Sequence, residues 1–411
     1  MIEYSFIANS LRVSDLFRFL TQFPRFRSGE KLLRTGIARF FGIDADRVFP
    51  FASGRMGLFA FLSILNLKPD DEVIVPGYTC VVVTNAIKYT GARAVYVDIA
   101  PGTLNMATAN IRQAISARTK AIIVSHNFGI PFPGIQQIRH DFPGICIVED
   151  AAHALGSEVD GRKVGLLGDV SFFSMEYSKP ITTGMGGFVM IHNQTYLGAF
   201  QSYYQTLRYY PRIYRTRIFL SLSAHLITTH PWLRPYKGYL FRILRKFDLL
   251  FQTSQAETQG ELPPFYPAKL SPGLALLGAI QMDRLEPVLA HKKNLARAYY
   301  EMFQNCAGLQ QFYDPHAVYV RYPLLLQRDC DRDQLAKRIK QETGLNVGVW
   351  FNDVVHPAGS FRYCYQPSCC PVGETVSRRM INLPISIHLP VEHVCQIKEK
   401  LLHVMEDYIR T

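Results

Sequence analysis

The sequence lacks the cysteine spacing that a zinc site or a disulfide framework requires. Its eight cysteines are scattered over 411 residues, and no pair of Cys-x-x-Cys elements occurs at a zinc-type spacing. Cys364, Cys369 and Cys370 form a cluster, which we interpret as a loop with free thiols because the histidines of a zinc site are missing. The sequence therefore predicts no metal and favours a reducing compartment.

Long apolar runs are also missing. The longest one, residues 218–229, is interrupted by Ser221, Ser223 and His225, and it is shorter than the roughly twenty residues that a membrane-spanning helix needs. The first residues show neither the basic start nor the apolar run of a secretory signal. We therefore expect a cytoplasmic protein without a membrane-spanning helix.

Acidic residues are absent from one long segment. Between Glu176 and Asp248 the chain has no carboxylate, whereas arginines and lysines recur there among aromatic residues and supply most of the net charge of +12. Residues 203–250 suit a basic, amphipathic helical insertion. Two interpretations stay open: the insertion packs on its own domain or across a dimer, or it makes a peripheral contact with the inner membrane surface. Nucleic acid is not expected, because no recognition motif accompanies the charge.

Short apolar runs alternate with helical periods over the first part of the chain. This alternation predicts an α/β domain with a mostly parallel sheet, whose ligands gather at the carboxyl ends of the strands. Residues 1–261 would form this large cofactor-binding domain, with residues 203–250 inserted in it. Strands are predicted at residues 72–75, 94–97, 121–124, 146–148, 170–173 and 187–191, and helices at 82–89 and 111–116.

The rest of the chain predicts a second, smaller unit. A chain of this length allows about two domains. Residues 262–411 would comprise a linking helix and a small α+β domain. The linking helix is predicted from residue 271 through 299, followed by strands at 318–326 and 346–350 and helices at 332–343 and 391–408.

A lone lysine follows an acid and a serine that lie at predicted strand ends. Asp150 closes one strand, and Ser174 precedes Lys179 by five residues. Lysine can form a Schiff base with pyridoxal phosphate, the acid can keep the pyridine nitrogen protonated, and the hydroxyl can bind a phosphate oxygen. Structural roles stay open: Asp150 as a helix N-cap and Lys179 as a surface lysine. The pattern predicts pyridoxal 5′-phosphate as cofactor and Lys179 as the catalytic residue.

A phosphate site is predicted at the start of another helix. Ser53, Gly54 and Arg55 precede a helical run at residues 56–65. Free backbone N–H groups at a helix N-terminus attract a phosphate, and the Arg55 guanidinium can contact it directly.

Together these segments resemble the DegT-type sugar aminotransferases, a branch of the fold-type-I pyridoxal-phosphate enzymes. The resemblance implies an aspartate-aminotransferase-like fold and a homodimer. It also implies transfer of an amino group, from L-glutamate, to a keto sugar on a nucleotide diphosphate through an internal aldimine on Lys179. Some relatives with histidine in place of this lysine are sugar dehydratases, so Lys179 argues against that chemistry. The resemblance runs from about residue 35 to the C-terminus, with landmarks at 53–58, 71–76, 149–154, 161–165, 172–187 and 281–285.

The resemblance assigns five further residues. His153 would lie near the phenolic oxygen of the cofactor, although a histidine bonded within the core is an equal alternative. Cys80 occupies the position of a ring-stacking aromatic residue, and Tyr78 could stack instead. Lys269 could replace the arginine that reaches the neighbouring subunit's phosphate, and His356 would face the substrate or lie in a surface loop.

Two other functions stay open beside the transfer to a nucleotide-linked sugar. The basic insertion could bring the enzyme to a membrane, where it would act on a lipid-linked acceptor. The altered stacking and phosphate positions could instead mark a non-catalytic scaffold or regulator. The basic composition itself suits an anionic substrate.

Overall fold

A seven-stranded sheet forms the centre of the large unit in the computed structural model, which describes residues 3–5, 10–229, 236, 239, 242, 243, 246 and 255–410. The neighbouring strands from β5 to β10 run parallel, and β11 pairs antiparallel with both β10 and β2. The predicted α/β architecture with a mostly parallel sheet is confirmed. The strand order is β2 (Val48–Phe51), β11 (Gly187–Ile191), β10 (Val170–Ser174), β7 (Cys146–Asp150), β6 (Thr119–Ser125), β3 (Glu72–Pro76) and β5 (Arg93–Val97).

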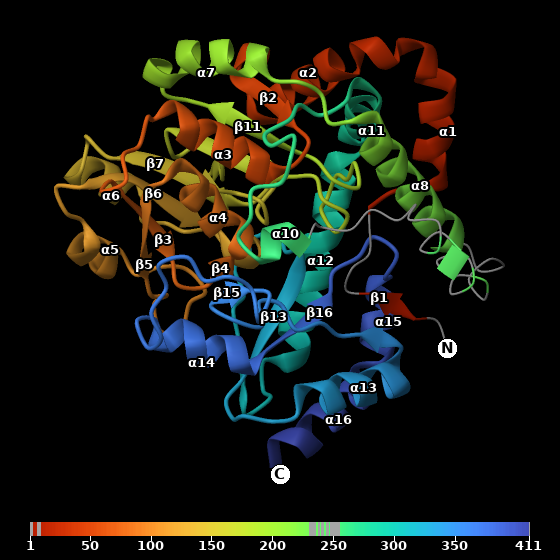
Figure 1. The fold of residues 1–411 in the computed structure, drawn as a ribbon. Coiled ribbons are helices and arrows are strands. Elements are labelled where there is room, and N and C mark those ends of the chain that lie inside the picture. Colours follow the sequence, from red (N-terminus) through yellow and green to blue (C-terminus); the bar gives the residue numbers. More distant parts are fainter. Residues whose placement is uncertain are drawn as a thin grey trace.

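Helices surround this sheet, and local sequence explains where two of them begin and end (Figure 1). α3 (Gly54–Ile64) starts at Ser53, whose side chain accepts a hydrogen bond from the N–H of Met56 at 3.3 Å. α4 (Val81–Thr90) ends where Gly91 adopts a left-handed conformation with φ of 87°. The other helices of this unit are α1 (Val13–Gln22), α2 (Gly29–Phe41), α5 (Thr108–Ala114), α6 (Ile135–Asp141), α7 (Gln194–Thr206), α8 (Arg212–Thr229) and α10 (Gln255–Thr258).

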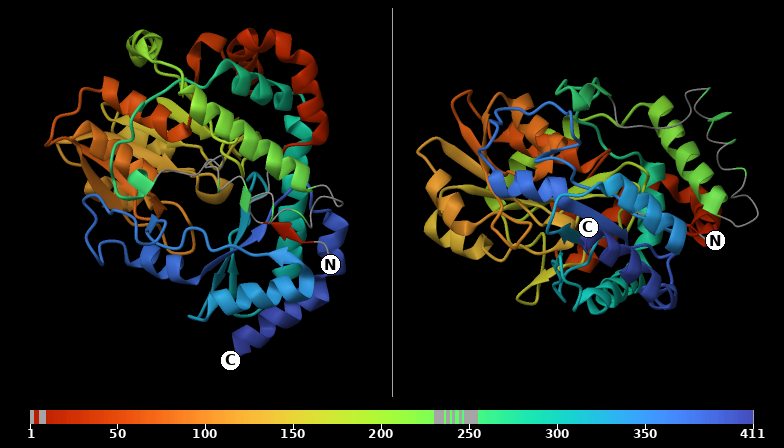
Figure 2. Two further views of the ribbon diagram at one scale, coloured as in Figure 1. Left: turned by 45° about the vertical axis from the view of Figure 1, so that its right-hand side comes forward. Right: turned by 90° about the horizontal axis from the view of Figure 1, so that it is seen from below.

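The second unit has its own antiparallel sheet and its own core. The sheet order is β12 (Leu309–Gln311), β13 (Arg321–Leu326) and β16 (Met380–Pro384). A long helix, α12 (Leu285–Phe303), begins in the core of the large unit and ends in the core of the second one (Figure 2). Around this sheet lie α13 (Arg332–Thr343), α14 (Pro371–Arg379), α15 (Val391–Gln396), α16 (Lys398–Arg410) and β14 (Leu345–Asn346), which pairs with β1 (Tyr4–Ser5).

Three predicted elements of this part differ from the structure. The linking helix divides into α11 (Pro272–Met282) and α12, because Arg284 leaves helical geometry and its Nε bonds a carboxylate oxygen of Asp15 at 2.9 Å. The predicted strand at 346–350 ends at Asn346, and the backbone N–H of Trp350 bonds the side-chain oxygen of Asn382 at 2.6 Å instead. The terminal helix is interrupted at Ile397.

One short pairing joins the two units beside the carboxyl ends of the strands. β4 (Thr79–Cys80) pairs in parallel with β15 (Val355–His356), so that His356 stands opposite Cys80. A small hairpin, β8 (Glu158–Val159) with β9 (Arg162–Lys163), lies outside both main sheets.

The described part of the basic insertion packs on its own chain. α8 buries Ile218, Leu222 and Leu226, and Phe219 contacts Phe19 of α1 with ring centroids 5.5 Å apart. Most of residues 230–254 lies outside the described part of the chain. Among the described helices, none combines the length and the apolar character that crossing a membrane demands.

Candidate active site

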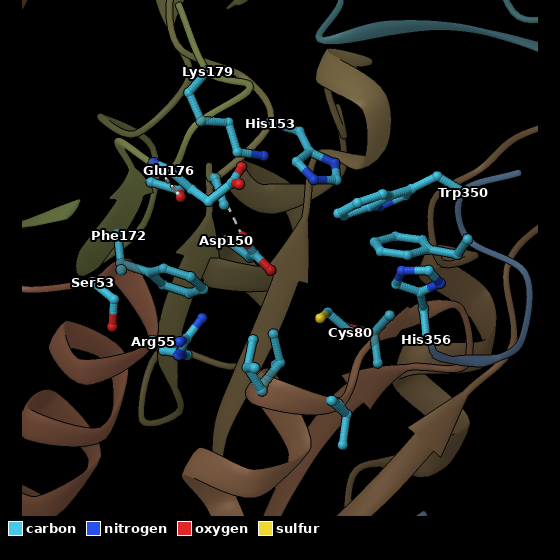
Figure 3. Close-up of a pocket in the computed structure, with 18 of the residues that line it drawn as sticks. Ser53, Arg55, Cys80, Asp150, His153, Phe172, Glu176, Lys179, Trp350 and His356 are labelled. Atoms are coloured by element: carbon cyan, nitrogen blue, oxygen red, sulfur yellow. Dashed lines mark hydrogen bonds between the residues drawn. The ribbon is translucent and has the colours of Figure 1, made fainter. Parts of the chain in front are cut away.

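A cavity of about 300 Å³ lies where the predicted strand ends meet. β7, β10 and the N-terminus of α3 form one side of it, and the loop carrying Trp350, Phe351 and His356 forms the other (Figure 3). The carboxyl ends of parallel strands are the usual ligand site of such sheets. Of the sequence-predicted residues, nine line this cavity: Ser53, Gly54, Arg55, Cys80, Asp150, His153, Ser174, Lys179 and His356.

Lys179 is held by its backbone and directs its amine into the cavity (Figure 3). Its N–H bonds the carbonyl of Glu176 at 3.0 Å, and its carbonyl accepts the hydroxyl of Ser10 at 3.1 Å. Burial lowers the pKa of Lys179 from 10.5 to about 8, and the charge of Glu176 opposes this shift only partly. A neutral amine, which nucleophilic attack requires, is therefore accessible near neutral pH.

Gln281 braces the loop after this lysine. Its side chain accepts the N–H of Thr182 at 3.0 Å and donates to the carbonyl of the same residue at 2.7 Å. Both partners are buried. These two hydrogen bonds connect Gln281, about a hundred residues further along the chain, to the loop that follows Lys179.

Asp150 ends β7 and faces the same cavity (Figure 3). One carboxylate oxygen accepts the N–H of Ala152 at 3.1 Å. Burial raises the pKa of Asp150 from 3.8 to about 6, and that N–H and the charge of Lys179 only partly oppose it. A protonated pyridine nitrogen would supply the cation that this carboxylate needs.

The N-terminus of α3 packs closely against the backbone of β10. A Cβ on Gly54 would lie 2.7 Å from the carbonyl oxygen of Phe173, so only glycine fits there. Ser174 lies at the end of β10, half-buried, and its hydroxyl accepts the N–H of Glu176 at 3.2 Å. A helix N-terminus, a hydroxyl, a carboxylate and an amine together match the phosphate, ring nitrogen and aldehyde of pyridoxal phosphate.

Arg55 lines the cavity but is already paired. Its Nε lies 2.6 Å from one carboxylate oxygen of Glu257, and its Nη2 donates to the other at 2.9 Å. Both side chains are largely buried. The direct phosphate contact expected of Arg55 therefore competes with Glu257. Sequence reasoning missed Glu257 because residues 255–258 carry no motif.

Two histidines on the cavity wall are neutral. The Nδ1 of His153 accepts the N–H of Phe128 at 3.3 Å, which leaves its proton on Nε2, and burial lowers its pKa well below the usual value. His356 has its Nδ1 2.7 Å from the side-chain oxygen of Asn352, and burial lowers its pKa to about 4. Neither histidine adds positive charge at neutral pH.

Tyr78 and Lys269 do not line this cavity. Tyr78 is fully buried, and its hydroxyl donates to the carbonyl of Phe351 at 3.2 Å, so it does not stack on a ring in the cavity. The Nζ of Lys269 lies 3.4 Å from the carbonyl of Gln205 and 4.7 Å from the centre of the Tyr204 ring. Tyr78 therefore points away from the cavity, whereas the expected contact of Lys269 is with the phosphate of a neighbouring subunit and stays a prediction.

His126 is a further cavity residue that the sequence marks only by its place at a strand end. Its Nδ1 accepts the N–H of Phe132 at 3.0 Å, so Nε2 carries the proton and donates to Glu149 at 3.2 Å. Hydrogen bonding lowers the pKa of Glu149 although burial opposes it. Glu149 directly precedes Asp150, and the backbone N–H of His126 donates to the carbonyl of Asp150 at 3.1 Å, so this pair lies beside the acid.

Arg321 stands behind the wall formed by Trp350. Its guanidinium carbon lies 3.9 Å from the centre of the indole, and its Nη2 donates to the hydroxyl of Ser178 at 3.3 Å. No sequence motif marked these residues, because β13 and the Trp350 loop reach the cavity only through packing of the second unit.

Comparison with known proteins agrees with this geometry. The sequence model of the DegT/DnrJ/EryC1/StrS aminotransferase family matches residues 25–205 and 242–402. The chain belongs to this family. It is therefore a pyridoxal-phosphate-dependent aminotransferase. Residues 206–241, which contain α8, lie outside the match.

Similar proteins cover nearly the whole chain. It is 29% identical over 376 residues to uncharacterized protein MJ1066 from Methanocaldococcus jannaschii, covering 89% of this chain and 86% of that one. It is 26% identical over 358 residues to GDP-perosamine synthase from Escherichia coli O157:H7, covering 87% and 85%. The PLP form of the putative sugar aminotransferase Spr1654 from Streptococcus pneumoniae superposes with a TM-score of 0.74 at 20% identity, covering 99% of each chain. The aminotransferase fold is thereby confirmed.

Proposed function

We propose that this enzyme transfers an amino group from L-glutamate to the keto group of a sugar carried on a nucleoside diphosphate. The observation that carries the proposal is that the amine of Lys179 and the carboxylate of Asp150 enter one cavity (Figure 3). The name of the similar E. coli protein, GDP-perosamine synthase, supports the sugar class. So does dTDP-4-dehydro-2,3,6-trideoxy-D-glucose 4-aminotransferase of Saccharopolyspora spinosa, 35% identical over 40% of this chain and 42% of that protein.

Asp150 and Lys179 would have different roles, since Asp150 would bind the cofactor and Lys179 would move a proton. Pyridoxal phosphate, when bound, supplies an electron sink for charge that develops at the α-carbon of the amino donor. Asp150 would hold the proton on the ring nitrogen. The amine of Lys179, with its pKa near 8, would take a proton from the donor's α-carbon and deliver it to the C4′ carbon of the cofactor.

The remaining cavity residues would bind and orient. The N–H groups at the start of α3 and the hydroxyl of Ser174 would hold the phosphate. Trp350, Phe351 and neutral His356 would close the opposite wall and keep water from the reacting atoms. The net charge of +12 favours the approach of so anionic an acceptor.

We also propose that the enzyme is a homodimer. Leu262 and Phe265 are exposed apolar residues that follow α10, and Glu257 and Thr258 of α10 line the cavity. A partner covering these residues would therefore lie next to the active site. Light scattering during size-exclusion chromatography tests this, and a monomeric mass at micromolar concentration contradicts it.

A half-reaction tests the proposed function. Cofactor-loaded enzyme incubated with L-glutamate alone should release 2-oxoglutarate in a stoichiometric burst, and adding a nucleotide-linked keto sugar should make the release continuous. Lys179→Ala should give no burst. If the loaded wild-type enzyme releases no keto acid from glutamate or from any other amino acid, the proposal is wrong.

A further inference from the structure

Helix α1 presents a row of apolar side chains to solvent. Val13, Phe17 and Leu20 are 63%, 67% and 60% exposed, and their spacing places them on one face of the helix. Phe23, 49% exposed, continues the row in the 3₁₀ turn that follows. We refer to these four residues as the α1 stripe. Scattered exposed apolar residues are ordinary, but a row of four on one face indicates an interaction surface.

The opposite face of α1 fixes the helix to the protein. Asp15 is buried and pairs with Arg284 of the α11–α12 junction. Phe19 is buried and contacts Phe219 of α8. α1 runs along the outer edge of the molecule in two views (Figures 1 and 2). The α1 stripe is therefore held outward on a rigid support.

The surroundings of the stripe are cationic. Arg12, Arg25, Arg27 and Lys31 are exposed on this segment. Within residues 10–43 the only acids are Asp15, paired with Arg284, and Glu30, which accepts the hydroxyls of two tyrosines of the α7–α8 region. Asp283, which approaches from the end of α11, pairs with Arg18.

The neighbouring insertion adds charge of the same sign. It contains no acid from residue 177 to residue 247. Its described positions Tyr236, Tyr239, Arg242 and Lys246 are all exposed. Apolar and aromatic residues beside arginines and lysines are the composition of helices that lie in the headgroup layer of a bilayer.

Neither α1 nor α8 falls within the residues that the family model matches. The family match begins at residue 25, after α1, and omits residues 206–241, which contain α8. The two elements contact each other through Phe19 and Phe219. The four residues of the α1 stripe are not among those that line the active-site cavity.

We propose that the α1 stripe and its flanking arginines dock this enzyme on an anionic lipid bilayer. Apolar side chains would enter the headgroup layer while Arg12, Arg25 and Arg27 contact lipid phosphates. Charge decides against a second copy of the chain as the occupant, because a two-fold contact would bring the arginines of one stripe against those of the other. We assign the apolar contact to α1, and α8 supports it by burying Ile218, Leu222 and Leu226.

Vesicle flotation with the full-length enzyme tests the proposal. At low salt, the wild-type enzyme should float with phosphatidylcholine vesicles that contain phosphatidylglycerol. With vesicles of phosphatidylcholine alone, it should remain unbound in the bottom fraction. Phe17→Glu combined with Leu20→Glu should reduce the bound fraction by about tenfold or more. Arg25→Gln combined with Arg27→Gln should reduce it and weaken its dependence on salt.

Phe361→Glu is the matched control, because Phe361 is also an exposed aromatic residue but lies outside both the stripe and the proposed dimer surface. It should float as wild type does, and all variants should keep the glutamate half-reaction, which shows that they are folded. Absence of wild-type binding, equal binding to both vesicle types, or binding that survives the stripe variants overturns the proposal. So does a stripe variant that converts a dimer into a monomer. None of these results bears on the aminotransferase reaction, which is measured separately.

Discussion

The two ends of the active-site cavity differ in how their charges are matched. At one end, Lys179 is buried and Asp150 is half-buried, neither with a complete partner, and their pKa values move from 10.5 and 3.8 to about 8 and about 6. At the other end, Arg55 meets both carboxylate oxygens of Glu257. The first pair is left for a ligand to satisfy, whereas the second is balanced within the protein.

This difference indicates that the cofactor gains more binding energy at the Asp150 end of the cavity than at the Arg55 end. A protonated ring nitrogen would stabilise the carboxylate of Asp150, which is otherwise costly to bury. Arg55, by contrast, offers a phosphate only the part of its charge that Glu257 leaves unbalanced. The phosphate would then depend mainly on the backbone N–H groups of α3 and on Ser174.

Substitutions at the end of the cavity that holds Lys179 and Asp150, which we call the ring end, should slow the reaction most. Lys179→Ala removes the amine that moves the proton, so the glutamate half-reaction should slow by at least about a thousandfold. Lys292→Met is the matched control: Lys292 is also buried, but it donates to the carbonyl of Ile385 at 2.9 Å outside the cavity lining. Rapid-mixing measurements of 2-oxoglutarate release compare the two. If both substitutions slowed the half-reaction equally, a catalytic role particular to Lys179 would be contradicted.

Asp150→Asn should have the next largest effect. The amide cannot keep the ring nitrogen protonated, so the half-reaction should slow by about a hundredfold while the cofactor still binds. The measurement is the single-turnover rate at saturating glutamate. A rate close to that of wild type would show that the carboxylate does not face the ring.

The same substitution should stabilise the cofactor-free protein, because burial raises the pKa of Asp150. A carboxyl group with a raised folded-state pKa stabilises the fold below its unfolded value of 3.8 and loses that contribution as pH rises through about 6. Above about pH 6, the Asp150→Asn variant should gain about 1–3 kcal/mol in free energy of unfolding, and below the unfolded value the gain should vanish. Urea titrations at both pH values check this, and a gain independent of pH would contradict it.

The smallest effect concerns the phosphate end. Glu257→Gln should free the charge of Arg55 for the phosphate and tighten cofactor binding by about tenfold, while lowering stability because a buried cation loses its partner. Equilibrium dialysis against pyridoxal phosphate measures the affinity. Weaker binding would mean that Glu257 orients Arg55 rather than competing for it.

Much of the ring end could be predicted from the sequence. Asp150, Ser174 and Lys179 follow predicted strands, and parallel strands bring their carboxyl ends together whatever the details of packing. Glu257 and Trp350 could not be found in this way. They reach the cavity only because α10 packs on α4 and because β15 pairs with β4, and neither contact leaves a periodic signal.

The break between α11 and α12 was missed for a similar reason. The apolar period continues through Asp283 and Arg284, so the pattern predicts one helix. The side chain of Arg284 instead bonds Asp15, which lies 269 residues earlier in the chain. The local sequence pattern predicts which helices and strands form, but contacts between residues distant in the chain determine where a helix ends.

The attachment of the cofactor to one lysine is the central claim, and peptide mapping tests it most directly. The loaded enzyme is treated with borohydride, which fixes the cofactor to the amine that holds it, and the labelled peptide is then identified by mass spectrometry. We predict a single label on Lys179. A label on Lys292, on several lysines or on none would contradict the account.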